Sequence, residues 1–261
     1  AMTEKTEEEM FATMERSLQV MKESVQDGLD KDKRSASGLT GGDAYKLNEA
    51  LKAGKNIAGH FFGNAMMKAV AVAQTNACMG RIVASPTAGS CGILPSALLT
   101  LQEEKNISDK DLVMALFTAS AVGIVIATNA SVAGAAGGCQ AECGAASAMA
   151  AAAMVELCGG TPKQCEHACA IALKNILGLV CDPVAGLVEI PCIKRNAGGV
   201  GNALVAAELA LAGVESHIPA DEVIVAMKKI GDTMSSTLKE TAEGGLAVTP
   251  TGKKLCEKVF G

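Results

Sequence analysis

Aromatic residues are almost missing from this sequence. Its 261 residues include no tryptophan and one tyrosine, and aromatic residues make up 2% of the chain. The core must therefore consist of Ala, Leu, Ile, Val and Met, which favours closely packed helices over a β-sandwich. The chain also has no basic run, and its formal net charge is −5. These two features argue against nucleic acid or an anionic membrane surface as a partner.

No CxxC pair occurs among the ten cysteines. Zinc-ribbon and thioredoxin-type sites are thereby excluded, and so is the short-spaced cysteine run of ferredoxins. The N-terminal stretch AMTEKTEEEM is acidic and polar, so it cannot serve as a secretory signal. We therefore expect a cytoplasmic protein, in which metal binding, catalysis or burial is a more usual role for cysteine than disulfide formation.

The most apolar run is Leu112–Ala130, which is long enough to span a membrane. It is rich in Ala, Ser and Thr, and it lacks basic flanks and an aromatic belt. We interpret it as a buried helix at the centre of a soluble bundle, so no membrane partner is expected.

The pattern along the chain predicts an all-α protein. Thr6 and Glu9 form a capping box in front of an amphipathic helix. Further helices are expected at 44–53, 57–79, 95–105, 108–130, 143–157, 162–178, 199–212 and 220–242, followed by a polar tail. We expect a single compact domain in which an N-terminal helical segment, 1–35, joins a catalytic part, 36–261. Its Gly- and Pro-rich loops at 36–43, 84–92, 131–142 and 178–198 are where a site would form.

Three cysteines stand out in Gly- or Pro-punctuated sequence outside these predicted helices, while Cys91, in the loop at 84–92, is ambiguous. The three are Cys139 in AGGCQ, Cys181 in VCDP and Cys192 in PCIK. Thiolates on separate loops can meet at one iron–sulfur cluster, and three of them would leave one iron free to act as a Lewis acid. Scattered cysteines are more often buried as small apolar residues, which is our expectation for Cys143 and for most of the others. The spacing alone leaves both interpretations open.

Four longer segments carry a family resemblance. GLTGGDAYKL (38–47), SPTAGSCGILPSAL (85–98), AGAAGGCQAECG (133–144) and GLVCDPVAGLVEIPCIKRNA (178–197) closely resemble the alpha chain of bacterial iron–sulfur-dependent L-serine dehydratase. The resemblance extends from about residue 5 to residue 260. It implies a helical alpha domain that carries a [4Fe–4S] cluster on Cys139, Cys181 and Cys192, with the fourth iron open to substrate.

The resemblance also implies a reaction, the elimination of water from L-serine and its deamination to pyruvate and ammonia. The open iron would make the serine hydroxyl a better leaving group. The base that removes the Cα proton is not identified by the motifs, and we name Lys46 and Lys194 as candidates. SPTAGS offers hydroxyls and backbone N–H groups for the substrate carboxylate, and Arg195 suits the same task. The expected substrate-binding residues are therefore Ser85, Thr87, Gly89, Ser90, Arg195 and Asn196.

Partners follow from the same resemblance. Single-chain members of the family carry an additional smaller domain with a Ser-rich, His-containing motif, and no such motif occurs here. The resemblance thus implies a separate β subunit, and assembly into a homo-oligomer stays open.

Three other functions remain in competition. An iron–sulfur L-cysteine desulfidase would use the same chemistry to expel sulfide. A pyridoxal-phosphate dehydratase would need a phosphate cup, for which GGVGN (198–202) is a weak candidate without a matching lysine motif. A non-catalytic helical protein would use its cysteines only for packing.

Overall fold

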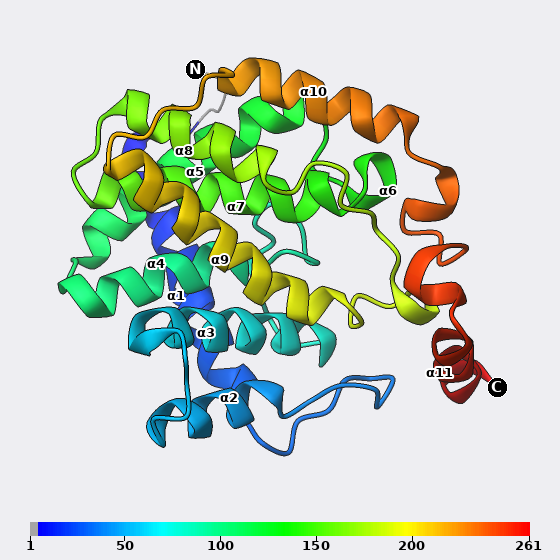
Figure 1. The fold of residues 1–261 in the computed structure, drawn as a ribbon. Helices are drawn as coiled ribbons and strands as arrows, with labels where there is room; N and C mark the ends of the chain where they lie inside the picture. The colour runs from blue at the N-terminus through cyan, green and yellow to red at the C-terminus, as the bar shows by residue number, and fades with distance from the viewer. Residues whose placement is uncertain (1–4) are drawn as a thin grey trace.

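The regular structure is helical throughout the part of the chain that is described, which confirms the all-α prediction (Figure 1). The structure is a computed structural model that describes residues 5–261, so the first four residues of the predicted N-terminal segment lie outside it. Within this range the only β-type pairing is an isolated parallel bridge between Cys181 and Lys239. The helices are α1 (Glu7–Gly28), α2 (Asp43–Lys52), α3 (Gly59–Ala77), α4 (Ile93–Lys105), α5 (Asp109–Asn129), α6 (Gly134–Gly137), α7 (Cys139–Leu157), α8 (Pro162–Lys174), α9 (Cys192–Leu211), α10 (Ala220–Thr233) and α11 (Pro250–Phe260).

The centre of the fold is α7. Every residue from Cys139 to Val155 is buried. Helices α4, α5, α8, α9 and α10 all pack against it, and Figure 1 shows it crossing the middle of the molecule. Alanine is its commonest residue and adds little width to a helix, so neighbouring helices can approach on all sides.

The apolar helix α5 lies at the periphery, so our prediction that it forms the centre of the bundle is wrong. One face, with Leu112, Leu116 and Ile126, is buried against the core. The opposite face exposes Ile124 to 65% and Met114 to 49%. Within residues 5–261 it is the one helix long and apolar enough to cross a membrane, and 39% of its most apolar window is buried. Apolar composition predicted burial, but packing decided which helix became central.

Helix α1 begins as its sequence predicts. The Glu9 N–H donates to Thr6 Oγ1 at 3.2 Å, and the Thr6 N–H donates to Glu9 Oε2 at 2.9 Å. The buried residues Leu18, Met21 and Val25 belong to the common hydrophobic core, and α1 packs mainly on α3. The N-terminal helix is therefore packed into the same core as the helices that follow it.

Helices α7 and α9 begin earlier than the sequence predicts. Cys139 and Cys192 were expected in loops, but each is the first residue of a helix. The GGVG stretch, where the helix was expected to begin at residue 199, lies inside α9. Gly199 lies against the Ile93 side chain so closely that a Cβ atom there would collide with it. Its glycine permits close packing of α9 on α4.

The C-terminal part also departs from prediction. Helix α10 ends at Thr233, well before residue 242, and the chain continues through an irregular segment to Thr249. In this segment Glu240 and Ala242 have left-handed backbone conformations, with φ of 65° and 57°. The expected polar tail forms α11, which begins at Pro250 after the Thr249 side chain caps the Gly252 N–H at 3.0 Å.

Candidate active site

Cys139, Cys181 and Cys192 converge on one buried place. They come from the first turn of α7, the segment between α8 and α9, and the first turn of α9. All three are free thiols with at most 7% exposure. Burial, with the neighbouring Cys139 next in effect, raises the pKa of the Cys192 thiol to about 12. Burial and the same cysteine also raise the pKa of Cys181. The thiols therefore interact electrostatically across three segments.

Backbone contacts hold these segments together. The Gln140 N–H donates to the Leu179 carbonyl at 2.9 Å. The Cys181 N–H donates to the Leu238 carbonyl at 2.9 Å, and the Cys181 carbonyl accepts from the Glu240 N–H at 2.8 Å. The irregular C-terminal segment thus pairs with the backbone of Cys181 on both sides, which fixes the position of its thiol.

A glycine makes room for the Cys181 sulfur. A Cβ atom on Gly134 would stand 2.9 Å from Cys181 Sγ and 3.3 Å from Glu240 Oε2. A larger residue at this position would push the thiol away from the other two.

A fourth cysteine belongs to the same place, although the sequence argument assigned it to packing. Cys143 lies one turn after Cys139 on α7, and the two sulfurs are 3.3 Å apart in a hydrogen bond. This contact lowers the pKa of Cys139, to which the Arg195 charge also contributes, and it raises the pKa of Cys143. The i,i+4 spacing would have revealed the pair had the helix been predicted to begin at Cys139.

Arg195 is occupied by protein groups. Its Nη1 donates to the Val180 carbonyl and its Nη2 to Asp182 Oδ1, both at 2.8 Å. The other Asp182 oxygen accepts from the Leu246 N–H at 2.8 Å. The arginine therefore joins α9 to the segment around Cys181, and Asp182 extends this link to the C-terminal segment. Both flank the cysteine site as structural cross-links.

Asn196 is a second cross-link, fully buried in α9. Its Oδ1 accepts from the Gly92 N–H at 2.9 Å, and its Nδ2 donates to the carbonyls of Gly89 and Cys192 at 2.8 and 2.9 Å. The amide thereby ties the loop before α4 to the turn that carries Cys192, with all of these hydrogen bonds made to backbone.

The loop from Ser85 to Ser90 carries a buried carboxylate that the sequence argument missed. Thr87 Oγ1 donates a short hydrogen bond to Glu142 Oε1 and lies 3.1 Å from Ser90 Oγ. Gly89 borders the carboxylate closely, since a Cβ atom there would stand 2.6 Å from Glu142 Oε1. Ser85 Oγ is buried and makes no hydrogen bond. The position of Glu142, three residues after Cys139 on a helix of small residues, was the available signal.

The two lysines named as candidate bases lie together on the surface. Lys46 Nζ is 3.1 Å and Lys194 Nζ is 2.7 Å from the Asp43 carboxylate, and their side chains are 74% and 63% exposed. Their ammonium groups are thus in solvent and paired with a carboxylate. None of their hydrogen bonds reaches the cysteines.

Comparison with known proteins shows the family of this chain. Residues 1–247 match the family "Serine dehydratase alpha chain". This chain belongs to that family. The alpha-chain resemblance predicted from the motifs is thereby confirmed.

Relatives of this serine dehydratase alpha chain fall into two sizes. It is 56% identical to the probable L-serine dehydratase alpha chain of Bacillus subtilis (strain 168), over 99% of this chain and 86% of that one. It is 47% identical to the L-serine dehydratase alpha chain of Peptoniphilus asaccharolyticus, over 96% of this chain and 86% of that one. The L-serine dehydratase of Streptomyces coelicolor is 47% identical over 69% of this chain, which corresponds to 40% of that protein.

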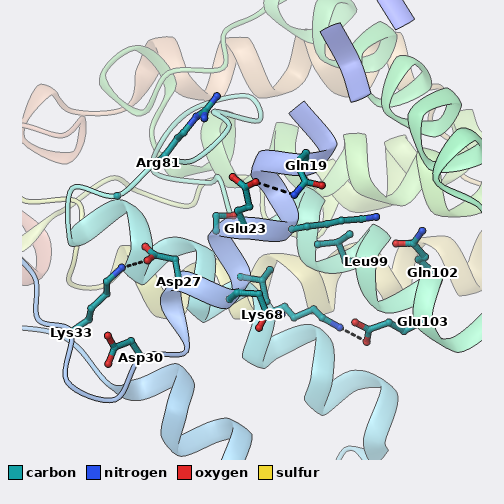
Figure 2. Close-up of a pocket in the computed structure, with 15 residues that line it drawn as sticks. Gln19, Glu23, Asp27, Asp30, Lys33, Lys68, Arg81, Leu99, Gln102 and Glu103 are labelled. Atoms are coloured by element: carbon teal, nitrogen blue, oxygen red, sulfur yellow. Dashed lines mark hydrogen bonds and ion pairs between the residues drawn. The ribbon is translucent and has the colours of Figure 1, made fainter. Parts of the chain in front are cut away.

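A large cavity of this alpha chain lies elsewhere, between α1, α3 and α4 (Figure 2). It has a volume of about 930 Å³ and is lined mostly by charged and polar residues. Figure 2 shows the ion pairs Lys33–Asp27 and Lys68–Glu103 across it. No cysteine lines this cavity. Volume alone would make it the first candidate for a binding site, but its opposite charges neutralise one another and it lacks groups suited to the family's chemistry.

Proposed function

We propose that this chain is the catalytic alpha chain of an L-serine dehydratase that converts L-serine to pyruvate and ammonia. The observation that carries the proposal is the convergence of Cys139, Cys181 and Cys192 from three separate segments. The family membership and the names of the two full-length relatives support the same substrate.

We further propose that the three cysteines bind a [4Fe–4S] cluster. Within residues 5–261 no group of three or more His, Cys, Asp or Glu side chains is placed to hold one metal ion. Three buried thiols on separate segments can each bind a different iron of one larger cluster. When bound, such a cluster supplies a Lewis acid to the serine hydroxyl.

The protein's own groups have separate tasks in this proposal. Arg195 and Asn196 hold the cysteine segments and the loop before α4 in register, because their hydrogen bonds are made within the protein. The Ser85–Ser90 loop contacts the substrate, and the unpaired Ser85 hydroxyl is its free donor for the carboxylate. We do not assign proton removal to Lys46 or Lys194, because both ammonium groups are exposed and paired with Asp43.

We propose a separate β subunit as the partner of this chain. The Streptomyces relative is much longer, and the matched part is 40% of its length. In our proposal residues 1–35 and 36–261 act as one alpha domain, and the additional part of the longer relative corresponds to the β subunit. This chain would then need the second chain for full activity.

The experiment is anaerobic reconstitution of the chain with iron and sulfide, beside a Cys181→Ser variant and with Cys256→Ser as the control. We expect nearly equal iron and sulfide and a broad visible absorption in the wild type and the control, but not in Cys181→Ser. Pyruvate formation from L-serine is then measured with the β subunit present. A colourless wild-type protein would contradict the cluster, and a preference for L-cysteine over L-serine would contradict the substrate.

A further inference from the structure

Glu142 is the one buried carboxylate in residues 5–261 with an oxygen that has no hydrogen bond. Three carboxylates are buried there, those of Glu142, Asp182 and Glu189. Asp182 uses one oxygen for Arg195 and the other for the Leu246 N–H. Glu189 accepts from Ser37 Oγ at 2.8 Å and from Thr40 Oγ1 at 2.7 Å, again one bond for each oxygen. Glu142 accepts only from Thr87, through Oε1, so its Oε2 is open.

The open oxygen lies beside the cysteine site. Glu142 lies three residues after Cys139, in the first turn of the same helix, α7. Its Oε1 is fixed by Thr87, and Gly89 leaves the space that the carboxylate occupies. The same loop holds the other unpaired polar group of this region, the buried Ser85 hydroxyl.

No cation of the described protein forms an ion pair with Glu142. The guanidinium group of Arg195 forms its ion pair with Asp182 instead, at 2.8 Å. Buried ionised groups in proteins are normally paired, because an unpaired charge loses its hydration without compensation. Burial raises the pKa of Glu142 and the Glu240 charge adds to the rise, while the Thr87 hydrogen bond and the more distant Arg195 charge oppose it. Within residues 5–261 the Glu142 carboxylate therefore has a hydroxyl partner, Thr87, but no directly paired cation.

We propose that Glu142 Oε2 binds the α-ammonium group of the amino-acid substrate. The inference rests on the proposed function and extends it, because it identifies the residue that selects an amino acid over a hydroxy acid. The substrate ammonium completes the missing ion pair, while Thr87 keeps the carboxylate facing the site. With the ammonium held at Glu142, the adjoining carboxylate is within reach of the Ser85–Ser90 loop, which supplies the complementary donors.

The test compares removal of the charge from the protein with its removal from the ligand. Glu142→Gln keeps the acceptor for Thr87 but loses the charge, so the KM for L-serine rises on the order of 10- to 100-fold with a smaller change in kcat. The inhibition constant of 3-hydroxypropanoate, which is serine without its amino group, stays within about twofold of the wild-type value. Glu142→Asp retains the charge on a shorter side chain, so its KM for L-serine lies between those of the wild type and Glu142→Gln. Glu156→Gln, an exposed position on the same helix, is the matched control and leaves both constants unchanged.

The outcomes separate this inference from the proposed function. Iron and sulfide content of each variant shows that the cysteine site is intact. Wild-type protein without pyruvate formation would overturn the proposed function itself. If the wild type turns over L-serine and Glu142→Gln has an unchanged KM, the ammonium contact alone is overturned. This holds whether or not kcat falls in the variant. Should Glu142→Gln not fold, the wild-type comparison still decides: 3-hydroxypropanoate that binds as tightly as L-serine would contradict the proposal.

Discussion

The cysteine site and the charged cavity between α1, α3 and α4 place polar groups in opposite ways. In the cavity, acidic and basic side chains pair with one another close to solvent, as Lys68 does with Glu103. In the cysteine site, the buried Ser85 hydroxyl has no hydrogen-bond partner, and the Glu142 carboxylate accepts a hydrogen bond at Oε1 but not at Oε2. Desolvated groups without partners cost stability, so a fold keeps them where a ligand will complete them. The difference teaches that unsatisfied chemistry, rather than volume, identifies the site of this protein.

Replacing a proposed ligand should have the largest effect. Cys192→Ser should abolish iron uptake and with it all measurable serine turnover, because a hydroxyl is a poor substitute for a thiolate. Cys143→Ser, one turn from Cys139, should retain iron and sulfide near wild-type amounts. Metal analysis after anaerobic reconstitution checks both variants. Equal loss in the two would make Cys143 a ligand as well.

Removing the buried amide of Asn196 should have the next largest effect. Asn196→Ala leaves the Gly92 N–H and the carbonyls of Gly89 and Cys192 without their partner, which should cost about 3 kcal/mol in the free energy of unfolding. Urea denaturation measures this loss. The partly buried Asn202→Ala is the control and should cost less. A stable Asn196→Ala protein with normal iron retention would show that the cross-link is dispensable.

A smaller change tests the space around Cys181. Gly134→Ala places a methyl group 2.9 Å from Cys181 Sγ, so the sulfur must shift, at a cost of about 1–3 kcal/mol. We expect faster loss of iron from the reconstituted protein, followed by the decay of its visible absorption in the presence of a chelator. Gly54→Ala, where a Cβ atom would meet nothing within 4 Å, strains a backbone with φ of 65° without touching the site, and so controls for a general loss of stability. If the wild type, Gly134→Ala and Gly54→Ala all retain iron equally, the cluster lies away from Gly134.

The charged cavity should give the smallest effect, visible only in the pH dependence. Burial lowers the pKa of Lys68 against the opposing effect of Glu103. The folded protein therefore binds this proton less tightly than the unfolded chain, whose lysine has a pKa near 10.4. Stability should accordingly rise with pH between the lowered value and the unfolded one. Lys68→Met removes this slope with serine turnover unchanged, as thermal unfolding in alkaline buffers would show. If stability rises with pH as steeply in Lys68→Met as in the wild type, groups other than Lys68 cause the pH dependence.

Local signals in the sequence predicted the parts of the fold that depend on neighbouring residues. The Thr6–Glu9 capping box and the Thr161–Pro162 start of α8 form where they were expected, because caps act within one turn. The early start of α9 was not predictable in this way. The sequence predicted a helix only from residue 199, and the contact of Gly199 with the Ile93 side chain, which fits α9 against α4, is a tertiary one.

The sequence by itself determined the helical class and the family, because composition and long motifs are properties of the chain alone, and it also singled out the cysteines of the proposed site, Cys139, Cys181 and Cys192. Tertiary structure alone decided that the alanine helix α7, not the more apolar α5, occupies the centre. It also decided that Arg195 serves as a cross-link and that Glu142 faces the cysteines with an open oxygen. The physical reason is that burial and pairing depend on contacts between segments far apart in the chain, which no local pattern records.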